Sequence, residues 1–307
     1  MILLCGIPSE SPMRMVEEAA MRLGLETHRL NQRDALTTAL VVDGTGGRLG
    51  FRQHGPDGSR DLARASGIFV RLTDWRVLPE YRRAGATAAR DRRRIEAWHA
   101  LLGDWLETAP ALVMNRTRPS NSNMSKPYQA RLITQAGFRV PETIVTNEVR
   151  AVRAFRRRHR RVVFKSISAH RSIVTELTPE AERRLAHIRL LPTQFQELIE
   201  GDDVRVHVVE GRLFATRIRS AGIDYRYAEG EGGGARYAPM VLPEAIAARC
   251  LELSRRLDLP LAGIDLKLTQ DGDWVCFEVN PAPAFSSFEE RTGQPIALAI
   301  ARALGGI

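Results

Sequence analysis

Two short segments near the C-terminus constrain this sequence most, because each places a carboxylate inside an apolar, strand-like run. Asp265 lies in Gly263–Leu268, and Glu278 lies in Cys276–Pro281. The intervening Gln270-Asp-Gly272 is a turn signal, so the two segments are predicted to form a hairpin. A carboxylate that is buried in such a strand must be paired or must coordinate a cation.

Three oxygen ligands for one hard cation are predicted at this hairpin. Side chains at positions i and i+2 of a strand point to the same face, so Glu278 and Asn280 should project together. The hairpin can bring Asp265 beside them. Mg²⁺ prefers carboxylate and carbonyl oxygens and keeps positions free for water and substrate phosphates. The alternative is an edge strand with Glu278 in solvent and Asn280 as a turn residue before Pro281.

Two lysines are candidate phosphate ligands. Lys165 ends the apolar run Val162–Ser166, and Lys126 follows the Asn- and Ser-rich loop Asn121–Ser125 at the start of a helical pattern. A lysine can be held as a point charge against a phosphate, and a loop that opens a helix offers N–H groups to an anion. Taken alone, each lysine could equally be a solvated side chain at the end of an element.

A linker is predicted at Gln196-Glu-Leu-Ile199, after a strand-like run and ahead of Gly201. Such a linker between two units could give a purine backbone hydrogen bonds and an apolar cover, with Asp203 placed for ribose hydroxyls. The alternative is a plain interdomain strand.

Helical and strand-like periodicities divide the chain into three units, 1–112, 113–193 and 194–307. The first reads as α/β, with strands near 2–5, 39–42 and 67–70 and helices near 13–23 and 90–108. The second alternates short strands with helices at 126–135 and after 147. The third is rich in hairpins, with strands at 203–209 and 212–220 around a turn at Glu210-Gly211. The predicted fold class is therefore mixed α/β (α+β).

The formal net charge of +9 comes mainly from arginine. Neither arginine cluster contains the interleaved aromatics that stack on bases, so nucleic acid is a poor expectation as partner. Exposed helix faces explain both clusters, with an acidic substrate or a polyanion as the alternative. The clusters are Arg153, Arg156, Arg157, Arg158, Arg160 and Arg161, and Arg90, Arg92, Arg93 and Arg94.

The cysteine pattern and the N-terminus bear on location. Cys5, Cys250 and Cys276 are isolated, without metal-ligand or disulfide spacing, which favours a reducing compartment. The first residues lack a basic region of the kind that opens a signal peptide. No stretch reaches the length of a membrane span. A cytoplasmic protein without membrane contact is expected.

The order of these elements resembles the ATP-grasp ligases, most closely the branch that includes the ribosomal-protein glutamate ligases and the graspetide macrocyclases. The resemblance covers roughly Val113 to the C-terminus, and the first unit resembles the pre-ATP-grasp domain. One departure is the segment after the second lysine, Ser166–Ser172, which is usually glycine-rich and here has no glycine. The pieces that carry the resemblance are Lys126, Lys165, Gln196–Ile199, Asp203-Val-Arg205, Arg217, Asp224-Tyr-Arg226, Asp265 and Glu278–Pro281.

The resemblance implies an ATP-grasp fold with a pre-ATP-grasp domain, a central subdomain and a C-terminal antiparallel-sheet subdomain, with ATP between the last two. Lys126 and Lys165 would bind phosphates, Gln196, Glu197, Leu198 and Ile199 the adenine, and Asp203 the ribose. Asp265, Glu278 and Asn280 would hold two Mg²⁺ ions, which Mn²⁺ can replace. Arg226 and Arg217 would face the γ-phosphate and the carboxylate. Related enzymes often form dimers or tetramers, so a homo-oligomer is compatible with the family.

The implied reaction joins a carboxylate to an amine or a hydroxyl through an acyl phosphate, releasing ADP and phosphate. The substrate would be a peptide or protein that receives an amino acid or is cyclised through its side chains. Two alternatives stay open: an amino-acid ligase for small metabolites that uses the same chemistry, and a non-catalytic nucleotide or polyanion binder.

Overall fold

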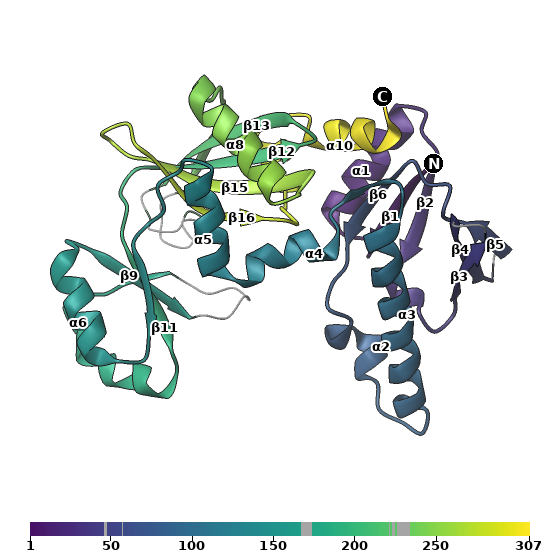
Figure 1. The fold of residues 1–307 in the computed structure, drawn as a ribbon, viewed down its shortest axis with the longest axis horizontal. Coiled ribbons are helices and arrows are strands. Elements are labelled where there is room, and N and C mark those ends of the chain that lie inside the picture. The colour runs from purple at the N-terminus through teal and green to yellow at the C-terminus, as the bar shows by residue number, and fades with distance from the viewer. Residues whose placement is uncertain (46–47, 57, 167–173, 221, 223–224, 226–233) are drawn as a thin grey trace.

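The computed structural model describes the whole chain except residues 46–47, 57, 167–173, 221, 223–224 and 226–233. Figure 1 shows an N-terminal body around a small parallel sheet, a central sheet beside α6, and a larger C-terminal sheet under α8. The described residues thus form a mixed α/β protein with both parallel and antiparallel sheets, as the sequence predicted. Among them, no helix is both long and apolar enough to cross a membrane.

The N-terminal body is built on a parallel sheet with strand order β2-β1-β6-β7. Both faces of β1 are buried: Leu3 and Cys5 pack in the core under α3, and Ile2 and Leu4 pack in the core under α1 and α10. A sheet covered by helices on both faces requires this continuous apolar run. Its elements are β1 (Ile2–Gly6), α1 (Ser11–Arg22), β2 (Thr27–Asn31), β6 (Gly67–Arg71), α2 (Pro79–Arg82), α3 (Ala88–Thr108) and β7 (Leu112–Met114).

A separate antiparallel sheet is inserted in this body. It consists of β3 (Ala39–Thr45), β4 (Arg48–Gly55) and β5 (Gly58–Asp61), with β4 in the middle. Phe51 from β4 stacks on Trp105 of α3 with ring centroids 4.0 Å apart, which fixes the small sheet to the main helix. β3 and β4 pair as a hairpin, and residues 46–47 between them lie outside the described residues.

The central sheet has strand order β10-β9-β11-β8, with antiparallel neighbours. Val152 and Phe155 of α6 pack onto it, while Arg153, Arg157 and Arg158 lie on the exposed side of that helix. These three arginines therefore form an exposed helix face, whereas Arg160 and Arg161 follow the helix and Arg161 is paired with Glu176 and Glu200. The elements are β8 (Thr143–Thr146), α6 (Val149–Arg158), β9 (Val162–Ser166), β10 (Thr175–Glu176), α7 (Pro179–Arg183) and β11 (Thr193–Glu197).

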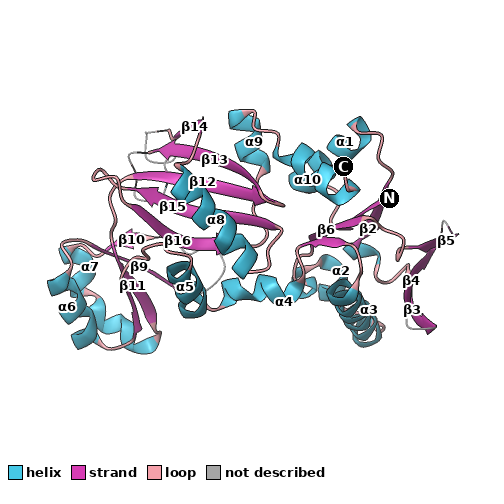
Figure 2. Ribbon diagram, turned by 45° about the horizontal axis from the view of Figure 1, so that its top comes forward, coloured by secondary structure: helices cyan, strands magenta, loops and turns pink. Residues whose placement is uncertain are grey.

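The C-terminal sheet is antiparallel with strand order β14-β13-β12-β15-β16, so β16 lies at an edge. Figure 2 shows α8 and α5 on this sheet, where Ile133, Phe138 and Leu253 share one core with Val204, Val206 and Val208 of β12. The elements are α4 (Thr117–Ser120), α5 (Lys126–Gln135), β12 (Asp202–Val209), β13 (Arg212–Arg219), β14 (Arg236–Met240), α8 (Glu244–Arg256), β15 (Leu261–Leu268), β16 (Trp274–Asn280), α9 (Ser286–Thr292) and α10 (Ile296–Gly305).

Two elements connect the three units that the sequence predicted. β11 begins at Thr193, beside the predicted boundary, and pairs with β8 and β9 in the central sheet. The last helix, α10, packs against α1 of the N-terminal body. The division into 1–112, 113–193 and 194–307 stays a prediction.

Candidate functional site

A cavity of about 940 Å³ lies between the central sheet and the C-terminal sheet, beside the start of α5. Its wall contains all of the residues predicted to bind nucleotide or metal: Lys126, Lys165, Gln196, Glu197, Leu198, Ile199, Asp203, Asp265, Glu278 and Asn280. These residues come from α5, β9, β11, β12, β15, β16 and the segment after β11. The fold therefore brings together side chains that lie up to 154 residues apart in sequence.

A bulge in β16 directs the polar side chains into this cavity. Asp265 pairs with Glu278, but the next residue, Leu266, pairs with Cys276, so Phe277 is an extra residue. Such a bulge shifts the alternation of side chains by one position. Cys276 and Val279 consequently point into the core, while Phe277, Glu278 and Asn280 line the cavity.

Glu278 is held ionised by the first residue of α5. The Lys126 ammonium lies 2.8 Å from Glu278 Oε2 and also donates to Asn123 Oδ1 at 2.7 Å. Burial on its own raises the pKa of Glu278, but the charge and hydrogen bond of Lys126 outweigh it, with Lys165 and Arg205 adding to the effect. The net pKa of Glu278 is lowered, so the carboxylate is charged at neutral pH.

Asp265 faces a buried guanidinium that the sequence analysis did not assign. Arg205 Nη1 donates to Asp265 Oδ1 at 2.5 Å, and the Arg205 side chain is only 8% exposed. Burial lowers the pKa of Arg205, but Asp265 and the neighbouring Tyr225 and Glu278 reverse that shift and keep it charged. The signal was present in the sequence: Arg205 alternates with Val204 and Val206, so it occupies the opposite face from the core.

The donor set fits a hard cation. Asp265 and Glu278 are direct register partners, and Asn280 pairs with Gly263 two positions along β15. Asn280 Oδ1 accepts a hydrogen bond from the backbone N–H of Ala282 at 2.9 Å, and a carbonyl oxygen has a second lone pair. In the part of the chain that the structure describes, no group of three or more His, Cys, Asp or Glu side chains is arranged to hold a metal ion. Two carboxylates and one amide suit Mg²⁺, which takes its other ligands from water and phosphates.

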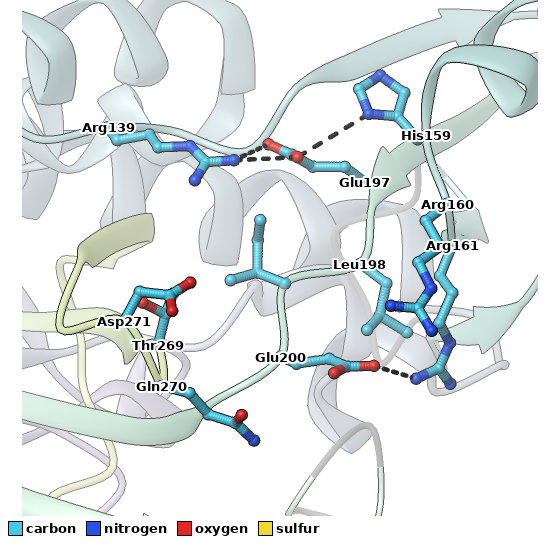
Figure 3. A pocket seen from close by; sticks show the side chains of 11 residues that line it. Arg139, His159, Arg160, Arg161, Glu197, Leu198, Glu200, Thr269, Gln270 and Asp271 are labelled. Atoms are coloured by element: carbon cyan, nitrogen blue, oxygen red, sulfur yellow. Dashed lines mark hydrogen bonds and ion pairs between the residues drawn. The ribbon is translucent and has the colours of Figure 1, made fainter.

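The segment after β11 forms one wall of the cavity and is fixed by polar contacts on its far side. The Glu197 carboxylate accepts hydrogen bonds from Arg139 Nη2 at 2.9 and 3.0 Å and from the Glu142 N–H at 2.8 Å. Figure 3 shows the contact of Arg139 with Glu197 in a second cavity, of about 310 Å³, which shares Glu197, Leu198 and Ile199 with the first.

Two backbone N–H groups at this segment already donate hydrogen bonds within the protein. The N–H groups of Glu197 and Leu198 donate to the carbonyls of Glu142 and Arg161, each at 3.0 Å. Within the described residues, the Ile199 N–H has no such partner. The Ile199 N–H therefore lies at this wall beside the apolar side chains of Leu198 and Ile199, both of which line the cavity.

Asp203, the candidate for the ribose, and Lys165, a candidate for the phosphates, lie on opposite sheets. Asp203 of β12 contacts the Lys267 ammonium at 3.2 Å. Lys267, which was not predicted, is a third lysine in the cavity wall beside Lys126 and Lys165. Lys165 of β9 lies in register with Gln194 of β11. Three lysines, Lys126, Lys165 and Lys267, therefore surround the cavity.

The two arginines predicted to act on the substrate are not placed in the same way. Arg217 forms an ion pair with Asp202, with Nε 2.6 Å from Asp202 Oδ2, and it is not part of the cavity wall. Arg226 lies outside the described residues, as does most of the segment after Ser166 that lacks glycine. The roles of both arginines stay predictions.

Three aromatic side chains that were not foreseen also form part of the cavity wall. Tyr237 of β14 packs against Tyr225 and Phe288, with ring centroids 6.3 and 5.9 Å apart. All three line the cavity, together with Arg205. They come from separate segments and meet only in three dimensions, so no spacing in the sequence marks them.

Comparison with known proteins agrees with this arrangement. A probable alpha-L-glutamate ligase of Histophilus somni (strain 2336) is 26% identical over 178 residues, which are 55% of this chain and 58% of that ligase. This chain thus matches little more than half the length of that relative. A RiPP-associated ATP-grasp ligase of Chryseobacterium gregarium, solved with ADP and a leader and core peptide, has a TM-score of 0.83 at 22% identity and covers 99% and 96% of the two chains.

The ATP-grasp ligase PsnB, solved with minimal precursor, Mg and ADP, is also similar. Its TM-score is 0.81 at 25% identity, and the match covers 99% of this chain and 96% of PsnB. The family model of the RimK-like ATP-grasp domain matches residues 125–304, more than half of the chain and the part that surrounds the cavity. The chain belongs to the RimK-like ATP-grasp family.

Proposed function

We propose that this protein is an ATP-dependent ligase that joins the carboxylate of a peptide or protein to an amine or a hydroxyl. One observation supports the proposal above the others: lysines, two carboxylates, an amide and an apolar linker, each predicted separately, line one cavity. The reaction would pass through an acyl phosphate and release ADP and phosphate. Family membership and the ADP and Mg in the PsnB complex support ATP and Mg²⁺ as cofactors.

Different residues along the cavity would bind the adenine, the ribose and the phosphates. Leu198 and Ile199 would cover the adenine, and Asp203 would receive the ribose hydroxyls. Lys126 and Lys165 would hold the phosphates, with Lys126 moving part of its interaction from Glu278 to the nucleotide. Phosphoryl transfer depends mainly on positioning and on neutralising the charge that develops, which cationic side chains on opposite walls can supply.

Magnesium would be held by Asp265, Glu278 and Asn280, and when bound it would neutralise phosphate charge. Two ions, replaceable by Mn²⁺, belong to the proposal. Arg205, already against Asp265, would orient that carboxylate. Arg226 and Arg217 are retained as candidates that face the γ-phosphate and the substrate carboxylate.

A peptide substrate is favoured by the structural relatives. The Chryseobacterium gregarium ligase was solved with a leader and core peptide, and PsnB with a minimal precursor. The formal charge of +9 complements an acidic peptide.

The three cysteines are buried and unpaired, which supports a reducing, cytoplasmic location.

The proposal is tested by identifying the products of Mg²⁺-dependent ATP turnover with glutamate-rich peptides and free amino acids as substrates. We expect ADP and phosphate, a peptide product detected by mass spectrometry, and loss of both in Asp265→Ala and Glu278→Ala. Arg153→Ala, on the exposed face of α6, serves as the matched control and should retain turnover. Release of AMP would contradict the acyl-phosphate route. Turnover with free amino acids alone would make the enzyme a small-metabolite ligase.

A further inference from the structure

The edge of β16 is covered by side chains and backbone from the segment that precedes the central sheet. An edge strand leaves outward N–H and C=O groups without a neighbouring strand. The Cys276 N–H donates to the Arg139 carbonyl at 2.9 Å. At the other end, the Asn115 side-chain amide donates to the carbonyl of Pro281, directly after Asn280. Between these two points the edge is covered by one side chain of α5, Gln129.

Gln129 binds β16 as a neighbouring strand would. Its Nε2 donates to the Val279 carbonyl at 2.9 Å, and its Oε1 accepts from the Val279 N–H at 2.9 Å. The side chain is 1% exposed, so both bonds are shielded from water. Val279 lies between Glu278 and Asn280, and the amide therefore fixes the backbone on which both side chains are mounted.

The same turn of α5 also contacts the carboxylate of Glu278. Lys126 precedes Gln129 by three positions, which places the two side chains on one face of the helix. Lys126 bonds to Glu278 at 2.8 Å while Gln129 bonds to the next residue of the strand. The helix thus controls both the backbone and the side chain at this point.

Attachment of α5 to the sheet does not require an amide. Ile133, one turn further along, is buried in the core with Val279 and Cys276 through apolar contacts alone. A second apolar residue at position 129 would extend that core. It would also leave the N–H and C=O of Val279 buried without partners, which costs about 1–3 kcal/mol for each unsatisfied group.

We propose that Gln129 is a positioning residue for metal binding: it sets the backbone of β16 so that Glu278 and Asn280 face the cavity together. This inference rests on the proposed function, because it presumes that these side chains hold Mg²⁺. Gln129 itself does not line the cavity and would touch neither metal nor nucleotide. Loss of the amide should therefore weaken the metal and leave nucleotide contacts elsewhere intact.

The test compares Gln129→Met, which keeps the length of the side chain and removes both hydrogen bonds, with Gln129→Asn, which keeps the amide but is one methylene shorter. Gln135→Met is the matched control, since Gln135 ends the same helix and is exposed. For each protein, calorimetry gives the affinity for ADP without Mg²⁺ and the Mg²⁺ dependence of that affinity. Hydrogen exchange reports the protection of the Val279 amide.

We expect faster exchange at Val279 and about 10–100-fold weaker Mg²⁺ binding in Gln129→Met, with a smaller loss in Gln129→Asn. ADP affinity without Mg²⁺ and all properties of Gln135→Met should match the wild type. Gln129→Asn carries the test if Gln129→Met does not fold.

Two results would overturn the inference: wild-type Mg²⁺ affinity in a variant whose Val279 amide exchanges freely, or an equal loss of ADP binding with and without Mg²⁺. Failure of the proposed function would look different, because then Mg²⁺ would not affect ADP binding in the wild type or in Glu278→Ala.

Discussion

At the scale of single residues, the Lys126–Glu278 pair links the first residue of α5 to the edge strand of the C-terminal sheet. Under the proposed function the Lys126 ammonium would have two partners in turn: the Glu278 carboxylate and the phosphates of the nucleotide. Removing it should therefore affect both ATP binding and the protonation of Glu278.

Lys126→Ala should raise the KM for ATP by about 10–100-fold, because a hydrogen bond to a charged group contributes about 1.5–3 kcal/mol. It should also raise the pKa of Glu278, since burial then acts with less opposing charge. Steady-state kinetics and the pH dependence of turnover measure the two effects. Arg131→Ala, an exposed change on the same helix, is the control. An unchanged KM would show that Lys126 does not contact ATP.

His99 provides a pH-dependent contribution to stability far from the cavity. It is buried in α3, and burial lowers its pKa from 6.5 to about 4. The unfolded chain binds this proton near pH 6.5 and the folded protein does not. The contribution of neutral, buried His99 to the free energy of unfolding is therefore complete above pH 6.5, and it is lost as the pH falls toward 4.

We expect urea unfolding midpoints to drop from pH 7 to pH 5 by a larger amount in the wild type than in His99→Phe. The phenyl ring can keep the contact with Trp98, whose ring centroid is 5.0 Å from that of His99. Equal drops in both proteins would assign the acid sensitivity to other groups.

At the scale of elements, β12 and β15 approach closely at a glycine. A Cβ on Gly263 would lie 2.5 Å from Arg205 Nη2 and 2.7 Å from the Pro283 Cβ. The absent side chain makes the space in which the Arg205 guanidinium reaches Asp265. Any larger residue at position 263 must displace that guanidinium or Pro283.

Gly263→Ala should destabilise the protein by about 1–3 kcal/mol through overpacking and should lower kcat/KM by moving Arg205 from Asp265. Denaturant unfolding and kinetics test both parts. Gly103→Ala in α3, where a Cβ meets nothing within 4 Å, should instead stabilise by about 0.5–1 kcal/mol. Normal activity and stability in Gly263→Ala would refute the role given to this glycine.

For strands, the sequence predicts which side chains belong to the site more readily than it predicts the direction in which each side chain points. Glu278 and Asp265 could be predicted because carboxylates are incongruous in apolar strands. The extra residue at Phe277 could not, since a bulge depends on the pairing register with β15 and has no marker in the strand itself. Arg205 was accessible by the same reasoning as Glu278, whereas Tyr225, Tyr237 and Phe288 meet only through the fold.

At the scale of the whole molecule, the C-terminal helix joins the two ends of the chain. Ile300 and Leu304 of α10 are fully buried in the core that also contains Ile2 and Leu4 of β1 and Val209 of β12. The N-terminal sheet and the C-terminal sheet therefore share a core, while the central sheet has a core of its own. The cavity lies between that central sheet and the C-terminal sheet, and its two walls belong to different cores.

We propose that a substrate carboxylate is activated by phosphorylation in this cavity. This proposal is tested most directly by labelling the carboxylate oxygens of an accepted peptide with ¹⁸O and following the label through one turnover. We expect one labelled oxygen in the released inorganic phosphate, because the phosphate leaves the acyl phosphate with one carboxylate oxygen when the nucleophile displaces it. Label in AMP, or unlabelled phosphate accompanying product, would contradict it.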